Sequence, residues 1–184
     1  MQPSRGGKTK VREGGSVSFK TDQERFWAND FGDEYIGRNK SENLRASNIS
    51  FFSRIFSRVH SIGSVMEYGA NIGINLLAIR ELLPRAELSA VEINRRAVEE
   101  LRRIEGVRAY EASLLDFVPE KTYDFVFTKG VLIHMNPSVL PEVYNLLHRA
   151  SSRYICIAEY YNPSPVTIPY RGHDDRLFKR DFAG

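Results

Sequence analysis

The chain has 184 residues and a single cysteine, Cys156, so no disulfide can form within it. This cysteine lies in the apolar run 154–158, where we expect a buried, unreactive thiol. No apolar run approaches the roughly 20 residues that a membrane-spanning helix needs. The N-terminus is basic and has no hydrophobic segment after it, which is unlike a secretory signal. We therefore expect a cytoplasmic protein with no membrane partner.

Net charge is also small, because 26 Lys and Arg residues stand against 23 Asp and Glu, giving +3. Part of the excess lies in residues 1–20, a Gly- and Ser-rich stretch with five basic residues and one acid. Such a stretch is typical of a flexible, solvated leader. Because basic residues elsewhere are balanced by acids, we expect no nucleic-acid partner, with RNA binding through the leader as the alternative.

From Ser64 on, the pattern predicts strands alternating with helices. Short apolar runs predict strands at 64–68, 87–93, 107–112, 123–128 and 153–159. Helices are predicted at 74–83, after the N-cap residue Asn94, and after the Asn136-Pro137 pair. This rhythm indicates an α/β fold, Rossmann-like and doubly wound, with a mainly parallel sheet and helices on both faces.

The segment before the first strand has a different composition. Phe26, Trp27, Phe31 and Tyr35 stand close together among charged residues, and 43–60 has the spacing of an amphipathic helix. We predict a leader at 1–20, an aromatic helical cap at 21–62 and a core domain at 63–184. The sequence leaves open whether the cap closes a site or adds a layer to the core.

The first predicted strand ends in a glycine loop, Gly69-Ala70-Asn71-Ile72-Gly73, that leads into a helix. Glycine allows a sharp turn and a close approach of backbone to a ligand. A dinucleotide fingerprint needs glycines at 71 and 74, where this chain has Asn71 and Ile74, which disfavours a pyrophosphate ligand. Asn71 tolerates a positive φ, so the turn itself is retained.

Two further elements follow at the ends of later strands. Glu92 ends the second strand about twenty residues beyond the loop, where an acid accepts hydrogen bonds from ribose hydroxyls. Ser113 and Leu114 follow the third strand. Together these features indicate a nucleoside-containing ligand; the alternative is a doubly wound domain that binds another nucleotide, or none.

Residues 64–160 resemble class I S-adenosylmethionine-dependent methyltransferases. The run 67–73 is similar to their first motif, with Asn71 replacing the usual middle glycine, and 123–134 is similar to their fourth motif and the loop after it. The resemblance implies S-adenosyl-L-methionine as cofactor and adenine contacts at Ser113, where an aspartate is commoner. The implied cofactor-binding residues are Glu67, Gly69, Ala70, Asn71, Gly73, Glu92, Ile93, Ser113, Leu114 and Lys129.

A narrower resemblance is to the methylases associated with pseudaminic acid biosynthesis. It rests on Phe26-Trp27, Phe31-Gly32, Tyr35, Arg38-Asn39 and the runs 130–134 and 159–163. It implies a small-molecule acceptor, a sugar or sugar nucleotide, in surface-glycan (polysaccharide) biosynthesis. The leading hypothesis is O-methylation of a sugar or sugar-derived acid. Alternatives are N- or carboxyl-methylation of another small molecule or peptide, methylation of RNA, and a non-catalytic cofactor-binding subunit.

His134 is the candidate base, because it follows the fourth strand and a histidine titrates in a useful range; the alternative is a packing or orienting role. Tyr35 and Arg38 are candidates to close over the methionine end of the cofactor, or else Tyr35 packs and Arg38 is solvated. Candidate substrate-binding residues at the end of the fifth strand are Tyr160, Tyr161 and Asn162.

The sequence predicts no metal site, since His173-Asp174-Asp175 are adjacent and cannot all face one ion. We also predict no strand after Glu159, whereas the resembled class closes its sheet with two more. The expectation is a core shortened at its C-terminus, which leaves catalytic competence open. Oligomeric state is not predicted.

Overall fold

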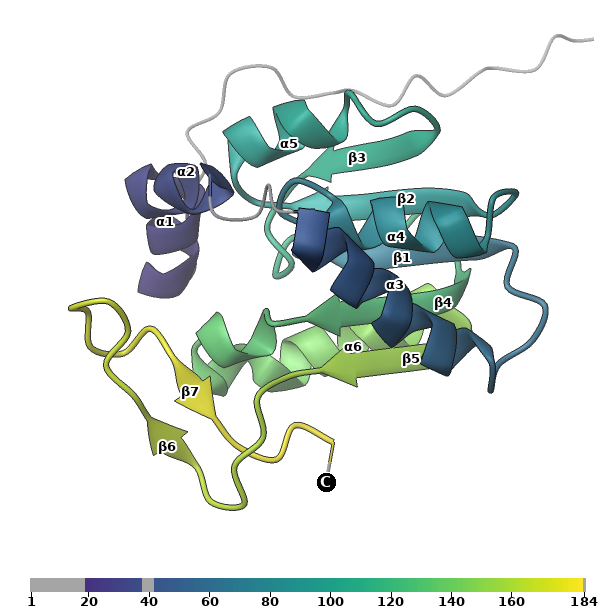
Figure 1. Ribbon diagram of the computed structural model, residues 1–184. Helices are drawn as coiled ribbons and strands as arrows, with labels where there is room; N and C mark the ends of the chain where they lie inside the picture. The colour runs from purple at the N-terminus through teal and green to yellow at the C-terminus, as the bar shows by residue number, and fades with distance from the viewer. Residues whose placement is uncertain (1–18, 38–41, 184) are drawn as a thin grey trace, which may run out of the picture.

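The centre of the molecule is a five-stranded parallel sheet in the order β3-β2-β1-β4-β5 (Figure 1). The structure is a computed structural model that describes residues 19–37 and 42–183. The strands are β1 (Ser64–Tyr68), β2 (Glu87–Glu92), β3 (Val107–Glu111), β4 (Tyr123–Lys129) and β5 (Ser151–Ala158). All five lie where the sequence predicted them, and the Rossmann-like α/β class is confirmed.

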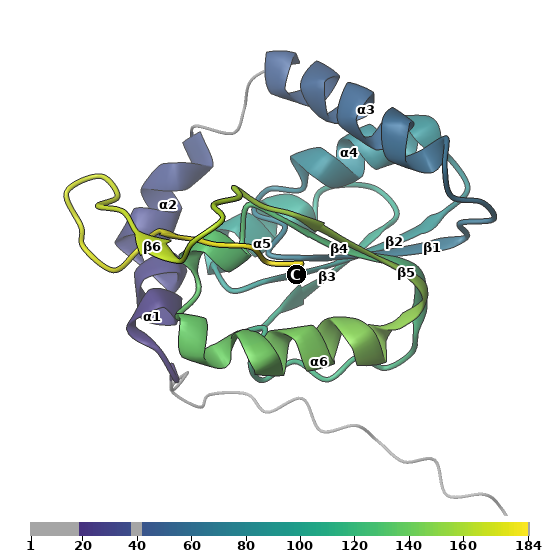
Figure 2. The ribbon, with the colours of Figure 1, turned by 90° about the horizontal axis from the view of Figure 1, so that it is seen from below.

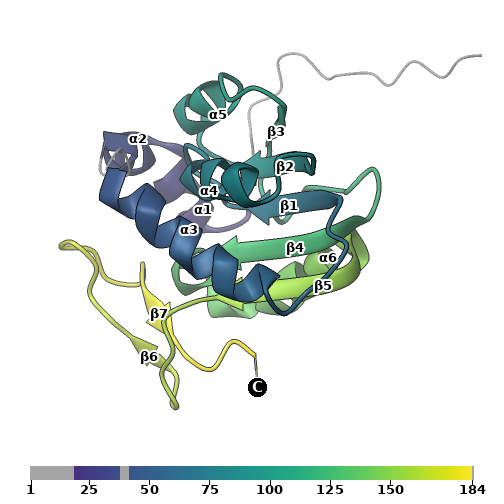
Figure 3. The same cartoon turned by 45° about the vertical axis from the view of Figure 1, so that its right-hand side comes forward.

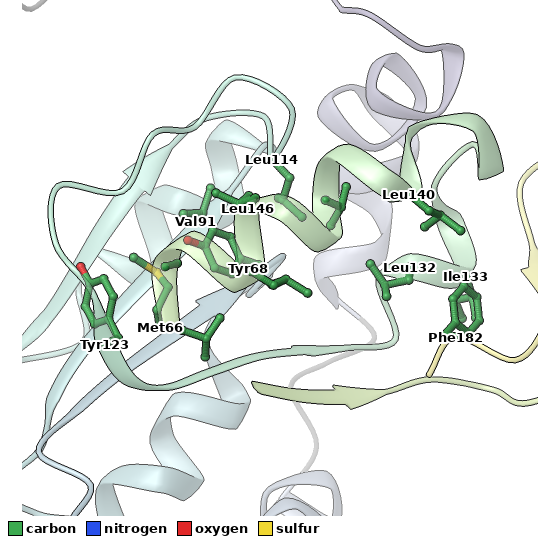
Figure 4. Packing of buried hydrophobic residues seen from close by; sticks show 14 residues of the cluster. Met66, Tyr68, Val91, Leu114, Tyr123, Leu132, Ile133, Leu140, Leu146 and Phe182 are labelled. Carbon is green, nitrogen blue, oxygen red and sulfur yellow. The ribbon is translucent and has the colours of Figure 1, made fainter. Parts of the chain in front are cut away.

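Helices cover both faces of the sheet (Figure 2). On one face lie α3 (Glu42–Phe56), α4 (Ile74–Leu82) and α5 (Arg95–Leu101), and on the other lies α6 (Leu140–Ala150). Successive residues of a strand point to opposite faces of the sheet. Val65 belongs to the hydrophobic cluster formed with α3 and α4, whereas Met66 and Tyr68 pack with Leu146 of α6 (Figure 4). Burial on both faces explains why the central strands β1, β2 and β4 are largely apolar at successive positions, whereas the edge strands β3 and β5 are only partly buried.

Asn94 caps α5, as predicted. Its Oδ1 accepts a hydrogen bond from the Ala97 amide at 2.9 Å, and its Nδ2 donates to Asp33 Oδ1 at 2.9 Å and to the Trp27 carbonyl at 3.3 Å. One side chain therefore begins α5 and joins it to the cap. The other predicted start, Asn136-Pro137, begins a 3₁₀ turn, η3 (Pro137–Val139), and α6 follows from Leu140.

The first part of the cap, residues 22–36, and the C-terminal segment both lie beyond the carboxyl ends of the strands, whereas α3, the last helix of the cap, covers a face of the sheet (Figure 3). The cap begins with α1 (Asp22–Ala28) and α2 (Asp30–Ile36). The prediction of no strand after Glu159 is wrong, since β6 (Val166–Thr167) and β7 (Phe178–Lys179) form an antiparallel pair. Each has two residues and pairs with the other rather than with the main sheet, so the apolar pattern was too short to read.

Residues 1–18 of the predicted leader, and Arg38 and Asn39 of the cap, lie outside the described residues. Lys20, at the end of the predicted leader, forms an ion pair with Asp116 at 2.9 Å. Within the described ranges, no helix has the length and apolar character needed to cross a membrane.

Replacing Asn94 should separate its two roles. Asn94→Ala removes the N-cap and the links to the cap, and should lower the free energy of unfolding by about 1–2 kcal/mol in urea denaturation. Asn94→Asp keeps the cap acceptor but loses the donor to Asp33, so it should loosen the cap, detected by Trp27 fluorescence. Asn145→Ala, exposed on α6, is the control and should stay within about 0.5 kcal/mol of wild type. Equal losses for both Asn94 variants would contradict this division of roles.

Candidate functional site

A cavity of about 890 Å³ lies at the carboxyl ends of the strands. Parallel α/β sheets bind ligands at this edge, where β1 has β2 on one side and β4 on the other. The residues that follow all five strands line it: Gly69, Ala70 and Asn71; Glu92 and Ile93; Ser113 and Leu114; Lys129, Gly130 and Val131; Ala158, Glu159 and Tyr160. The cap adds Trp27 and Tyr35, and the C-terminal segment adds residues 168–171.

The glycine loop after β1 has the expected left-handed backbone, with φ of 77° at Gly69 and 49° at Asn71. A Cβ at Gly69 would lie 2.6 Å from a methyl of Val131, so only glycine fits between the loop and the β4 turn. Gly73 is different from the other predicted loop residues, because it does not line the cavity. Its Cβ would lie 2.7 Å from Leu101, so glycine there allows the loop to pack on α5.

Glu92 is 8% exposed and lines the cavity as predicted. Its carboxylate accepts hydrogen bonds from the backbone amides of Asn71 (2.7 Å), Ile93 (2.9 Å) and Asn94 (2.8 Å). Burial raises the pKa of Glu92, and these amides oppose the rise by stabilising the anion. A carboxylate has about four acceptor positions, so Oε2, which accepts only from Asn71, keeps one for a ligand.

Glu67 is fully buried in β1, behind the cavity wall rather than in it. Asn75, which does line the cavity, donates from Nδ2 to Glu67 Oε1 at 2.6 Å. Glu67 Oε2 and Asn75 Oδ1 have no partner among the described residues. Burial raises the pKa of Glu67 to about 8, opposed by the Asn75 hydrogen bond and by the cation of Lys129. The pair thus holds unused polar capacity beside the cavity.

Glu159 is a site residue that the sequence reasoning did not assign. Its carboxylate accepts hydrogen bonds from the Thr128 hydroxyl (2.9 Å) and from three successive amides, Val131 (2.9 Å), Leu132 (3.0 Å) and Ile133 (3.4 Å). Those amides begin the 3₁₀ turn η2 (Leu132–His134). Glu159 therefore fixes the turn that carries His134. An acid directly after the fifth strand was the signal available in the sequence.

His134 lines the cavity and is 9% exposed. Its Nδ1 lies 2.7 Å from the Arg176 carbonyl, which can only accept, so Nδ1 carries the hydrogen and Nε2 keeps a lone pair. The rings of Trp27 and Tyr170 lie 4.7 and 4.9 Å from the imidazole, measured between centroids. Burial lowers the pKa of His134, and the Arg176 carbonyl partly opposes this. The imidazole is thus held neutral with one fixed tautomer.

Ser113 and Leu114 line the cavity, but the Ser113 hydroxyl donates to Glu24 of α1. Glu24 also completes a capping box with Thr21 at the start of α1. Tyr35 and Tyr160 line the cavity as predicted. Tyr161 and Asn162 do not: the Tyr161 side chain is exposed, and Asn162 donates from Nδ2 to the Ser164 carbonyl.

Three cations line the cavity, namely Lys129, Arg171 and Lys179. Each lies over an aromatic ring, that of Phe51, Tyr170 and Tyr160 respectively, at 5.4–5.9 Å from the centroid. No described carboxylate lies within ion-pair distance of any of them. The cavity wall therefore holds positive charge that is free to meet an anionic ligand.

His173 packs against the rings of Phe26 and Phe31, at 4.9 and 5.9 Å between centroids. In the part of the chain that the structure describes, no group of three His, Cys, Asp or Glu side chains is placed to hold a metal ion.

The pH dependence of stability should depend on Glu67. Its pKa is about 8 in the folded protein and 4.5 in the unfolded chain. The contribution of Glu67 to the free energy of unfolding is therefore complete below pH 4.5 and is lost as the pH rises through 8. Glu67 should contribute a loss of up to about 1.4 kcal/mol per pH unit across this window. The slope should therefore be shallower in Glu67→Gln, which is neutral throughout, while buried Glu92 keeps a slope of the same sign in both proteins. Urea unfolding at pH 5 and pH 8.5 measures this. Glu87→Gln, exposed on β2, should keep the wild-type slope; the same slope for Glu67→Gln would contradict the assignment.

A scan against protein-family models and a search of curated proteins find no match. Solved structures do match. The DhpI–SAM–HEP complex has a TM-score of 0.63 at 16% identity, over 90% of this chain and 85% of that one. The sugar N-methyltransferase KedS8 from Streptoalloteichus sp ATCC 53650 gives 0.60 at 16%, over 90% and 68%. The plantazolicin methyltransferase BpumL with SAH gives 0.59 at 17%, over 76% and 57%.

The chain thus spans 57% of the length of the plantazolicin methyltransferase. At these identities the likeness establishes architecture rather than activity. The chain has the Rossmann-like fold of S-adenosylmethionine-dependent methyltransferases.

Proposed function

We propose that this chain binds S-adenosyl-L-methionine and transfers its methyl group to a hydroxyl of a sugar or sugar-derived acid. The observation that carries the proposal is Glu92, a buried carboxylate with one free acceptor position in a cavity at the switch point of a methyltransferase fold. A ribose hydroxyl is a suitable donor to that position. The solved structures that share this fold include complexes with SAM and SAH.

The residues around the cavity fit this cofactor. Gly69 lets backbone approach a ligand without an intervening side chain, and Ile93 and Leu114 offer apolar surface to a base. The unpartnered oxygen of Asn75, which lines the cavity, suits the ammonium of an amino acid, and Glu67 behind it adds a carboxyl group whose ionised form a cation would favour. Lys129 suits the carboxylate. Tyr35 closes the same wall from the cap.

When bound, S-adenosyl-L-methionine supplies an electrophilic methyl group. The protein must then orient a nucleophile and accept its proton. His134 Nε2 accepts the proton of the acceptor hydroxyl, while the Arg176 carbonyl holds Nδ1–H and stabilises the imidazolium that forms. Glu159 fixes the turn that carries His134, and the rings of Trp27 and Tyr170 exclude water from the imidazole.

The acceptor is argued from the cations and aromatic rings of the wall. Lys129, Arg171 and Lys179 favour a ligand with a carboxylate or phosphate, which supports a sugar acid or sugar nucleotide over a neutral sugar. Tyr35, Tyr160 and Tyr170 offer rings and hydroxyls of the kind that pack on sugars. KedS8 is a sugar N-methyltransferase, which supports a sugar acceptor on this fold. The proposed role in surface-glycan biosynthesis rests on the resemblance to the methylases associated with pseudaminic acid biosynthesis alone.

Calorimetric titration tests the cofactor. Wild type should bind S-adenosylhomocysteine saturably and should not bind NAD. Glu92→Ala removes the ribose acceptor and should weaken binding by at least about 10-fold, the effect of one charge-assisted hydrogen bond. Glu99→Gln, exposed on α5, should bind as wild type does. An absence of S-adenosylhomocysteine binding by wild type would refute the proposal.

Replacing His134 tests the role of the base. His134→Gln should lower kcat by about 10²- to 10⁴-fold with an acceptor that has a hydroxyl nucleophile, and should leave S-adenosylhomocysteine affinity intact. Because burial lowers the pKa of His134, the acid limb of the wild-type rate profile should have its midpoint below pH 6.5. Turnover unchanged by the substitution would favour transfer to an amine or carboxylate, which needs no base.

A further inference from the structure

Glu24 is a buried carboxyl group in the cavity wall, with only neutral partners. It is 7% exposed, and it lies in α1, far from the core in sequence. Oε2 accepts hydrogen bonds from the Thr21 amide at 2.7 Å and the Thr21 hydroxyl at 3.1 Å, and Oε1 accepts from the Ser113 hydroxyl. No described Lys or Arg side chain forms an ion pair with it. A buried carboxylate of this kind is costly unless its acceptor positions are filled.

One hydrogen-bond acceptor position of the Glu24 carboxylate is open. A carboxylate offers about four, and Thr21 fills two and Ser113 a third. The remaining position is on Oε1, the oxygen that Ser113 draws toward the end of β3. Ser113, Leu114 and Ile93 line the cavity beside Glu24. A donor group on a flat ligand packed against Ile93 and Leu114 is the partner that this oxygen lacks.

Ser113 itself is poorly suited to meet that donor. Its hydroxyl hydrogen is directed to Glu24, and its oxygen accepts from the Leu115 amide at 3.0 Å. The Ser113 hydroxyl therefore orients the Glu24 carboxylate and does not itself bind the ligand. The carboxylate at the end of β3 thus comes from α1, 89 residues earlier in the chain.

We infer that Glu24 accepts a hydrogen bond from the exocyclic amino group of adenine and so selects adenine over a 6-oxopurine. The inference rests on the proposed function, since it needs an adenine nucleoside in the cavity. A 6-oxopurine presents a carbonyl where adenine has an amine, so a carboxylate there would face an acceptor and would disfavour that base. Because Glu24 belongs to α1, recognition of the base also depends on the position of the cap.

The test compares S-adenosylhomocysteine with S-inosylhomocysteine, its 6-oxo analogue. Trp27, the single tryptophan of the chain, lines the cavity from α1 and reports binding by fluorescence, with calorimetry as a second readout. Wild type should prefer the adenine compound by about 10- to 100-fold. In Glu24→Gln the preference should fall to about 3-fold or less, because an amide both donates and accepts. Glutamine preserves the capping box, so α1 should remain folded, which circular dichroism checks.

Two further variants complete the design. Glu34→Gln, exposed on α2 in the same cap, should keep the wild-type preference. Ser113→Ala, which removes the orienting hydroxyl but leaves the carboxylate, should keep most of it. A Glu24→Gln protein with the wild-type preference, or with equal losses for both ligands, would overturn the inference while leaving the cofactor assignment intact. Equal binding of both ligands by wild type would do the same, and binding of neither would refute the proposed function as well.

Discussion

Buried glutamates that accept hydrogen bonds from backbone amides fix the loops at the carboxyl ends of the strands, where the cavity lies. Glu92, at the end of β2, binds the glycine loop after β1, and Glu159, just after β5, binds the turn after β4. In each case a carboxylate from one strand end fixes a loop from the neighbouring region of the sheet. An amide donor is the partner that makes burial of such an anion tolerable without a nearby cation. The cavity keeps its shape because these loops cannot move independently.

The same arrangement divides the charge of the site. The buried glutamates accept hydrogen bonds from backbone amides and hydroxyls. By contrast, the cations of the cavity wall lie over aromatic rings and have no carboxylate partner among the described residues: Lys129, Arg171 and Lys179. An anionic ligand thus meets free cations rather than free carboxylates. His134, neutral and fixed by the Arg176 carbonyl, lies between the rings of Trp27 and Tyr170.

The cap and the C-terminal segment, which contains β6 and β7, both contribute to the cavity wall although they are far apart in the sequence. Gln23 of α1 donates to the Asp175 carbonyl at 2.9 Å, across 152 residues of sequence, and Phe26 packs on His173. These contacts join the two segments, which both lie beyond the carboxyl ends of the strands (Figures 1 and 3). Two aromatic residues of the cap, Phe26 and Phe31, thus pack on rings of the C-terminal segment, between β6 and β7.

The sequence by itself determined the five strands of the main sheet, their parallel arrangement and the loop after β1. It also determined Glu92 as a cavity residue, because local periodicity and strand ends place these features wherever the fold forms. Only the tertiary structure decided that the Ser113 hydroxyl donates a hydrogen bond to Glu24, and that Glu159 accepts hydrogen bonds from the turn that carries His134. It also decided that β6 pairs with β7. It also placed Gly73, Tyr161 and Asn162 outside the cavity wall. Those outcomes depend on contacts between residues up to 89 positions apart, and the local pattern of a sequence does not specify which distant side chain will fill a given hydrogen bond.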